Sequence, residues 1–486
     1  MFATGTTRRQ LLGRAAGGAA LLGLPGALAG CGSDDRVKVA RGGDPWRRYA
    51  GTELNFISEN TAPTLAIGAN LGEFERLTGI RVKITQLELS ALVQKVALDF
   101  GSGLGSYQVV YADPYQILAP YREALAPLNA FQADEDLPSV ADMGDFFPTQ
   151  LDAAGKFEDP ETIYALPYDA PTMIWMYRRD LFDKHGDRME QDLGFDVMPS
   201  LDSTWDQYLQ MATWFGKNAK DDVPYGTLHM AKQHDALMND FSNVLWSFGG
   251  DYFNDGEKVG RMGSRDPGES LLTTEPSLRA AEFYQRLLKV AHPSSLGWDW
   301  TGAGEGFKAG QAAMAPLWHE DAAGVEDSAL KGKVGFAPLP KGPARRSDMY
   351  GGTGLGINAT ASADAQKAAW LFVVWATQKK TQLENLKSEV GGGTPTLQSV
   401  YELPEVVDAR ERPSKIPNIL TYGAIEQAWK PENIGLRPKI PAWNECDTRM
   451  FTALSKMLAS GGDPQTYMQQ AKDGMEQAIE NAKALA

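Results

Sequence analysis

Apolar and polar positions along the chain alternate between strand-like and helix-like patterns from residue 53 onward. Residues 53–58, 80–84 and 107–111 have the short apolar patterns of strands. Between them, apolar residues recur every three or four positions in 64–78 and 89–100, which predicts two helices. This order of strand, helix, strand, helix and strand predicts a parallel, doubly wound sheet.

The same kind of pattern continues to the C-terminus. It predicts strands at 163–168, 173–177, 336–340 and 355–357, and helices at 363–378 and 450–460. Thr204 is a suitable N-cap for a further helix. We also expect the segment that ends in Ala312-Ala313-Met314 to be helical, with Trp318 following it.

The first 30 residues have the features of an export signal. Residues 1–31 contain no acidic residue, and the apolar run at 15–28 is too short for a bilayer, which needs about 20 residues. Residues 7–12 (TRRQLL) are typical of a twin-arginine signal, and 28–31 (LAGC) are typical of a bacterial lipobox. We therefore predict a signal peptide over 1–30, a lipid on Cys31 and a polar tether over 31–50. The alternative is a plain secretory signal with an incidental cysteine.

Composition restricts the classes of function. The chain of 486 residues is 43% hydrophobic, which predicts two lobes rather than one core. Its 62 acidic and 47 basic residues give a net charge of −15, which argues against nucleic-acid binding. Two cysteines and five scattered histidines argue against a disulfide scaffold and a metal centre. P-loop, G-x-G-x-x-G and G-x-S-x-G motifs are absent, so we expect no cofactor and no enzymatic activity.

Four segments, in their order and spacing, carry a family resemblance. They are 73–82 (EFERLTGIRV), 164–168 with 177–180, 307–314 with Trp318, and 351–356 (GGTGLG). From about 53 to 480 the chain resembles the maltose-binding-protein-like group of extracellular solute-binding proteins of ABC importers. The resemblance implies an α/β periplasmic-binding-protein-like fold whose two lobes enclose a ligand cleft. The chain would cross the hinge three times, near 167–172, 338–340 and 385–393. Lobe I would comprise 51–167 plus 338–388, and lobe II 168–337 plus 389–486.

The resemblance also implies a function. We expect a monomeric, lipid-anchored receptor on the extracytoplasmic face of the membrane, which binds a di- or oligosaccharide and delivers it to the permease subunits of an ABC importer. The alternatives are a receptor for a polyol, a glycerol-phosphodiester or a polyamine, and, from other classes, a secreted glycoside hydrolase or a structural lipoprotein. Paired carboxylates for a hydrolase could be present among the 62 acidic residues.

A sugar site requires planar polar side chains and flat aromatic rings. Glu59, Asn60 and Asp113 follow predicted strands, at the edge where parallel sheets bind ligands. Asp113 could instead cap a helix that begins at Pro114. Asp169 lies at the first predicted crossing, as a ligand group or a hinge hydrogen-bond partner.

The remaining candidates come from the second half of the chain. Trp318 and Trp246 could stack on a sugar ring, and Glu320 could complete an acidic cage with Asp113 and Asp169 for a polyamine. Backbone N–H groups of Gly351, Gly352 and Thr353 could bind a hydroxyl, or these residues could simply form a tight turn before the strand at 355. Arg437 would reach the ligand, unless it is an ordinary solvated arginine.

Overall fold

The computed structural model describes residues 43–390, 392–411 and 416–485. The predicted signal peptide and Cys31 lie outside these residues. The last residues of the predicted tether belong to the folded part, since a 3-10 helix spans Pro45–Arg47 and Tyr49 is buried. None of the helices in the described part of the chain is both long and apolar enough to cross a bilayer.

The first sheet has five strands, in the order β2 (Arg81–Leu87), β1 (Glu53–Glu59), β3 (Val109–Ala112), β12 (Thr353–Ile357) and β6 (Ala165–Asp169). β1 pairs in parallel with β2 and β3, as predicted. β12 runs antiparallel to both β3 and β6, so the whole sheet is mixed, and the predicted parallel arrangement holds for β1, β2 and β3. The sheet is mixed because β12, which comes from much later in the chain, lies between β3 and β6.

Helices predicted between the first strands are present. α1 spans Ala62–Thr78 and α2 spans Leu89–Ser102. α1 ends at Gly79, whose φ of 73° is the left-handed conformation that glycine adopts without strain. α13 (Ala363–Thr377) also packs on the sheet, and α14 (Lys379–Leu386) packs against α1 and α13. We call this sheet with its helices lobe I.

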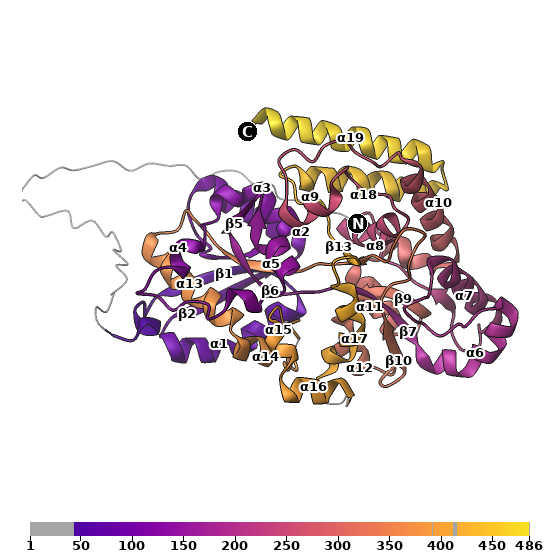
Figure 1. The fold of residues 1–486 in the computed structure, drawn as a ribbon, viewed down its shortest axis with the longest axis horizontal. Coiled ribbons are helices and arrows are strands. Elements are labelled where there is room, and N and C mark those ends of the chain that lie inside the picture. The colour runs from indigo at the N-terminus through magenta and orange to yellow at the C-terminus, as the bar shows by residue number, and fades with distance from the viewer. Residues whose placement is uncertain (1–42, 391, 412–415, 486) are drawn as a thin grey trace, which may run out of the picture. The chain divides into compact units, whose positions relative to one another are not determined.

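The second sheet has four strands, in the order β10 (Val334–Ala337), β7 (Met173–Arg178), β9 (Ala312–Trp318) and β8 (Tyr225–Thr227). Its helices are α6 (Arg179–Leu193), α7 (Trp205–Asn218), α8 (Asp235–Ser247), α10 (Glu275–Val290), α11 (Trp300–Lys308) and α12 (Asp321–Glu326). Thr204 caps α7, and Gln207 completes a reciprocal capping box. We call this group lobe II, and Figure 1 shows each sheet with its own helices.

The expected helix through Ala312-Ala313-Met314 is wrong. α11 ends at Lys308, Gly310 has a φ of 73°, and residues 312–318 form strand β9. Pro316, which lacks an N–H, is unsuited to a helix interior. The run is apolar and buried throughout, and such a run does not distinguish a strand from a buried helix.

The chain passes between the two sheets at three places. β6 leads to β7 through residues 170–172, and β10 leads to β12 through residues 338–352. After α14 the chain reaches α17 (Tyr422–Ala428), which contacts β7 and β10 of lobe II. Within these connections the short strand β11 (Asp348–Met349) pairs in parallel with β13 (Ile434–Gly435). The residue boundaries proposed for the lobes stay a prediction.

Two long helices end the described chain. α18 (Trp443–Ser460) begins earlier than the predicted 450, and α19 (Pro464–Leu485) packs along it (Figure 1). Both contact lobe II, α18 through α8 and α19 through α10. Cys446 is buried in α18 as a free thiol. The other described elements are α3 (Ala119–Tyr121), α4 (Asn129–Gln132), α5 (Pro148–Gly155), β4 (Lys156–Phe157), β5 (Asp159–Ile163), α9 (Gly256–Met262), α15 (Gln398–Tyr401) and α16 (Pro404–Glu411).

Candidate functional site

A cavity of about 280 Å³ lies between residues of the two lobes. Lobe I contributes Glu59 and Asp113, from the carboxyl ends of the parallel strands β1 and β3. This is the edge at which open α/β sheets bind ligands. Lobe II contributes residues from the end of β9, from α8 and from α11. The cavity is lined by Glu59, Asn60, Thr61, Ala62, Pro63, Leu89, Tyr111, Asp113, Asp169, Pro171, Asp235, Asn239, Trp300, Thr301, Glu305, Lys308, Trp318, Glu320, Asp321, Gly351 and Arg437.

Most of the residues predicted from the sequence meet at this cavity. Those that line it are Glu59, Asn60, Asp113, Asp169, Trp318, Glu320 and Arg437. Trp246, Gly352 and Thr353 do not line it. Trp246 is buried in α8, where its ring meets Tyr252 edge-on and its Nε1 donates to Asp251 (3.3 Å).

In the 351–353 turn it is Gly351, rather than Gly352 or Thr353, that lines the cavity. A Cβ atom on Gly351 would lie 2.8 Å from the Trp318 ring. The absence of a side chain at this position therefore lets the indole of Trp318 lie against the backbone. The turn therefore positions the tryptophan, and its role as a hydroxyl-binding backbone stays a prediction.

Several lining residues were not predicted from the sequence. They are chiefly Asp235 and Asn239 on α8, and Trp300, Glu305 and Lys308 on α11. No helix or strand was predicted for residues 235–247 or 300–306, so their faces could not be placed. Tyr111 was predicted only as a strand residue, although its hydroxyl donates to Glu59 (2.9 Å).

Arg437 is the centre of a buried charge cluster and is only 3% exposed, so the alternative of a solvated arginine is wrong. Its Nη1 contacts both carboxylate oxygens of Asp235, at 2.9 and 3.1 Å, and its Nη2 lies 3.7 Å from Asp113. The guanidinium also lies over the ring of Tyr115. Burial alone would lower the pKa of Arg437, but the charges of Asp235 and Asp113 hold it above its ordinary value.

Asp113 has the capping role considered for it and also lines the cavity. Its Oδ1 accepts hydrogen bonds from the N–H groups of Tyr115 (2.9 Å) and Gln116 (2.7 Å), so it caps the turn that begins at Pro114. Its other oxygen faces Arg437. Burial raises the pKa of Asp113, although Arg437 opposes this shift.

Asp169 and Glu320 form a second acidic group, in which their side chains are hydrogen-bonded to each other. Thr394 connects them, because its N–H donates to Asp169 (2.7 Å) and its hydroxyl donates to Glu320 (3.0 Å). Burial raises the pKa of Asp169 to about 7 and raises that of Glu320 well above its ordinary value. The two carboxyl groups therefore hold a proton between them near neutral pH.

His319 is hydrogen-bonded to Thr394, the residue that contacts both acids. Its Nδ1 accepts from the Thr172 N–H (3.0 Å), and its Nε2 donates to the Thr394 hydroxyl (2.8 Å). Burial lowers the pKa of His319 to about 4, so the ring is neutral. Thr172 lies between β6 and β7, so this network joins the first connection between the lobes to Thr394 after α14.

Two further lining carboxyl groups have raised pKa values. Burial raises the pKa of Glu59 to about 8 and that of Asp321 to about 7. Lys308, the one lysine among the described lining residues, is paired with Glu305 at 2.5 Å. The cavity is therefore rich in carboxyl groups whose charge burial disfavours.

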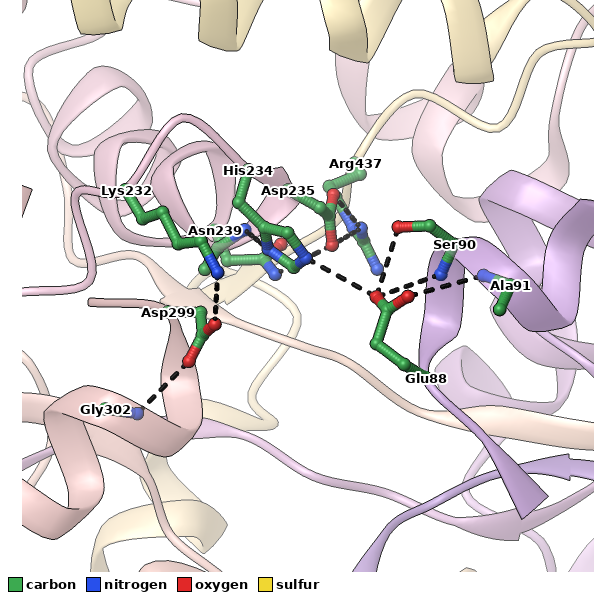
Figure 2. Close-up of polar contacts among 11 residues, drawn as sticks. Glu88, Ser90, Ala91, Lys232, His234, Asp235, Asn239, Asp299, Gly302 and Arg437 are labelled. Atoms are coloured by element: carbon green, nitrogen blue, oxygen red, sulfur yellow. Dashed lines mark hydrogen bonds and ion pairs between the residues drawn. The ribbon is translucent and has the colours of Figure 1, made fainter. Parts of the chain in front are cut away.

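At the mouth of the cavity the two lobes touch. His234, the N-cap of α8, lies 3.6 Å from Glu88, which caps α2 in lobe I (Figure 2). The His234 ring also meets the lining residue Trp300 edge-on, at 4.8 Å. Nearby, Asp299 caps α11 and pairs with Lys232 at 2.8 Å.

Carboxyl oxygens, an amide and two indole rings are groups that bind a solute with many hydroxyls. Within the described residues no group of His, Cys, Asp or Glu side chains has the arrangement of a metal site.

Comparison with known proteins places this geometry in a family. The family model described as "Bacterial extracellular solute-binding protein" matches residues 58–383.

Two curated relatives match most of the chain. A probable amino-acid ABC transporter periplasmic-binding protein, y4oP of Sinorhizobium fredii, is 23% identical and covers 79% of this chain and 82% of its own. The erythritol/L-threitol-binding protein of Mycolicibacterium smegmatis is also 23% identical, with 81% and 82% covered.

Solved structures of similar fold match this chain over nearly the whole of their own length. A solute-binding protein of Agrobacterium radiobacter K84 in complex with ribitol has a TM-score of 0.71 at 23% identity, covering 88% of this chain and 99% of that one. Maltose-bound MalE3 of T. maritima has a TM-score of 0.70 at 22% identity, with 90% and 100% covered. At these identities the likeness establishes the two-lobed α/β periplasmic-binding-protein fold.

Proposed function

Because the chain belongs to the family of bacterial extracellular solute-binding proteins, which are binding receptors of ABC transporters and not enzymes, we propose that it captures a small carbohydrate or polyol between its lobes. The observation that carries the proposal is the cavity itself. It combines strand-end carboxylates of lobe I with Trp318 and Trp300 of lobe II.

The size of the cavity favours a small solute. About 280 Å³ is near the lower end of the range for small-molecule pockets, which is roughly 300–1,000 Å³. A monosaccharide or a linear polyol suits this volume better than the oligosaccharide expected from the sequence. A glycerol-phosphodiester is disfavoured, because a phosphate would face many carboxyl groups and no free cation among the described lining residues. Relatives named for erythritol and L-threitol, or solved with ribitol, support a polyol.

We further propose that the receptor is anchored at the extracytoplasmic face of the membrane through a lipid on Cys31, close to its permease. The support is the LAGC sequence at 28–31, which follows an acid-free, apolar segment. A tethered receptor stays near its permease, and the polar residues after Cys31 would give it reach.

A solute screen tests the binding proposal. Purified protein is heated with linear polyols, monosaccharides and disaccharides, and its melting temperature is recorded. A true solute stabilises the folded state by mass action, by about 2.7 kcal/mol at 100 times its Kd. Small-angle scattering then compares the radius of gyration with and without the solute, which we expect to fall as the lobes close. Stabilisation by none of these compounds would contradict the proposed solute class.

A further inference from the structure

We propose, on the basis of the function proposed above, that the solute is an amino-substituted polyol or sugar, whose ammonium group binds the Asp169–Glu320 pair while its hydroxyls bind the other polar groups of the cavity. Two features of the cavity support this assignment: carboxyl groups outnumber cations in its lining, and one buried acceptor lacks a donor.

Carboxyl groups greatly outnumber cations around the cavity. The acidic lining residues are Glu59, Asp113, Asp169, Asp235, Glu305, Glu320 and Asp321, against Lys308 and Arg437. Both cations are already engaged, since Arg437 contacts Asp235 at 2.9 Å and Lys308 contacts Glu305 at 2.5 Å. Among the described residues, Glu59, Asp169, Glu320 and Asp321 have no lysine or arginine within ion-pair distance, and Asp113 has only the longer contact to Arg437. With neutral hydroxyls bound, these unpaired carboxyl groups would stay largely protonated, because burial raises their pKa values, whereas a cation would let them ionise.

The Asp169–Glu320 pair is the best place for a cation. Two adjacent carboxyl groups do not both ionise without a counter-charge, because two negative charges in direct contact repel each other. In the structure these groups are hydrogen-bonded to each other, and Thr394 fixes both. An ammonium group would replace the shared proton and supply the missing charge, and charge-assisted hydrogen bonds are roughly twice as strong as neutral ones.

A second observation, independent of the acids, also indicates a donor-rich solute. Asn239 lines the cavity and is 2% exposed, and its Oδ1 has no hydrogen-bond partner in the described structure. Its Nδ2 donates to Asp235 at 3.2 Å, which leaves the carbonyl oxygen as an acceptor. A buried acceptor without a donor is costly, so a donor from the solute is expected there. An aminopolyol carries several hydroxyl donors besides its ammonium group.

The shape of the site separates an aminopolyol from a polyamine. Trp300 and Trp318 give flat faces for the C–H surface of a sugar or for a cation. The polar groups at Glu59, Asn60 and Asn239 suit hydroxyls. A simple diamine would satisfy the acids and leave the other polar groups unfilled.

Calorimetric titration at pH 7 with two matched sets of three compounds tests the proposal. The compounds are D-glucitol, 1-amino-1-deoxy-D-glucitol and its N-acetyl derivative, with glucose, glucosamine and N-acetylglucosamine as a second matched set. We expect each amine to bind at least tenfold more tightly than its hydroxyl counterpart, and acetylation to remove this advantage. Putrescine, a diamine without hydroxyls, should bind more weakly than 1-amino-1-deoxy-D-glucitol and glucosamine.

Two variants locate the effect. Glu320→Gln keeps the shape of the side chain and removes its ability to ionise beside an ammonium group, so it should abolish most of the preference for the amine. Asp327→Asn is the matched control. Glu320 lies at the start of α12, and Asp327 is an exposed carboxylate just beyond the end of that helix, outside the cavity, so this variant should keep the preference.

Each other outcome is informative. Equal or tighter binding of the neutral compounds would overturn the amine assignment and leave the proposed receptor function intact. Equal binding of putrescine would overturn the role of the hydroxyls. Binding of none of the compounds, amine or neutral, would overturn both proposals. An amine preference that survives Glu320→Gln would overturn the assignment to the Asp169–Glu320 pair.

Discussion

Some residues of the cavity stabilise the fold and also present polar atoms to which a solute could bind. Arg437 shows how this is done, since a buried guanidinium is tolerated only when it is paired and hydrogen-bonded. Asp235 provides a contact through both its oxygens, and Asp113 adds a second, weaker one. Asp113 in turn uses its other oxygen as a helix cap. The same side chain therefore serves local structure and the site.

Trp318 and Asp113 should bind one solute from opposite lobes. Trp318 ends β9 of lobe II and is only partly buried, whereas Asp113 follows β3 of lobe I. Trp318→Ala should weaken binding by roughly 1–3 kcal/mol, in line with other stacking contacts, and keep the melting temperature within a few degrees. Asp113→Asn retains the capping oxygen and should weaken binding about tenfold, since it removes a charged acceptor.

Calorimetric titration of each variant measures these losses. Trp246→Phe is the matched control, because Trp246 lies outside the cavity and its replacement should leave affinity unchanged. Unfolding of Trp318→Ala without solute would mean that the indole is a core residue. Unchanged affinity in both cavity variants would place the solute elsewhere.

At the scale of elements, Lys439 joins the ends of two helices. Its Nζ donates to the carbonyl oxygens of Asp152 and Ala153 near the end of α5, of Lys156 just after it, and of Arg261 in α9. The last carbonyls of a helix have no partner within it, so they require donors from elsewhere. Lys439 supplies them from the segment that follows β13, and Arg261 adds an ion pair to Asp152 at 2.6 Å.

Lys439→Met should therefore destabilise the protein strongly. The methionine fills a similar volume but leaves buried carbonyls without a donor, which we expect to cost about 2–5 kcal/mol of unfolding free energy. Chemical denaturation measures the change. Lys456→Met, at an exposed position of α18, is the control and should change stability by less than about 0.5 kcal/mol. A Lys439→Met protein as stable as the control would show that water satisfies these carbonyls.

At the scale of the whole molecule, the lipid anchor should decide where the receptor resides. In Cys31→Ala the thiol that would carry the lipid is absent, so the variant should move from the membrane fraction to the soluble extracytoplasmic fraction. Cell fractionation with intact-mass measurement checks both the location and the lipid. Cys446→Ser is the control, because Cys446 is buried in α18 and should not affect anchoring. Wild-type protein without added lipid mass would contradict the anchor.

Local patterns in the sequence were sufficient for part of this site. β1, β2 and β3 were predicted close to their observed bounds, because side-chain periodicity and glycine stops are local signals. Residues that directly follow parallel strands lie at the ligand-binding edge in any such sheet. For this reason Glu59, Asn60 and Asp113 could be placed at the cavity from the sequence alone.

The tertiary structure decided the rest. The order of the first sheet depends on β12 inserting between β3 and β6, which is a long-range pairing with no local signal. Whether 312–318 form a strand or a helix depends on β7 and β8 lying on either side. Arg437 is buried because Asp235, some 200 positions away in the sequence, pairs with it. The sequence by itself determined the family and the lobe I edge, whereas long-range packing determined which charges lobe II brings to face that edge.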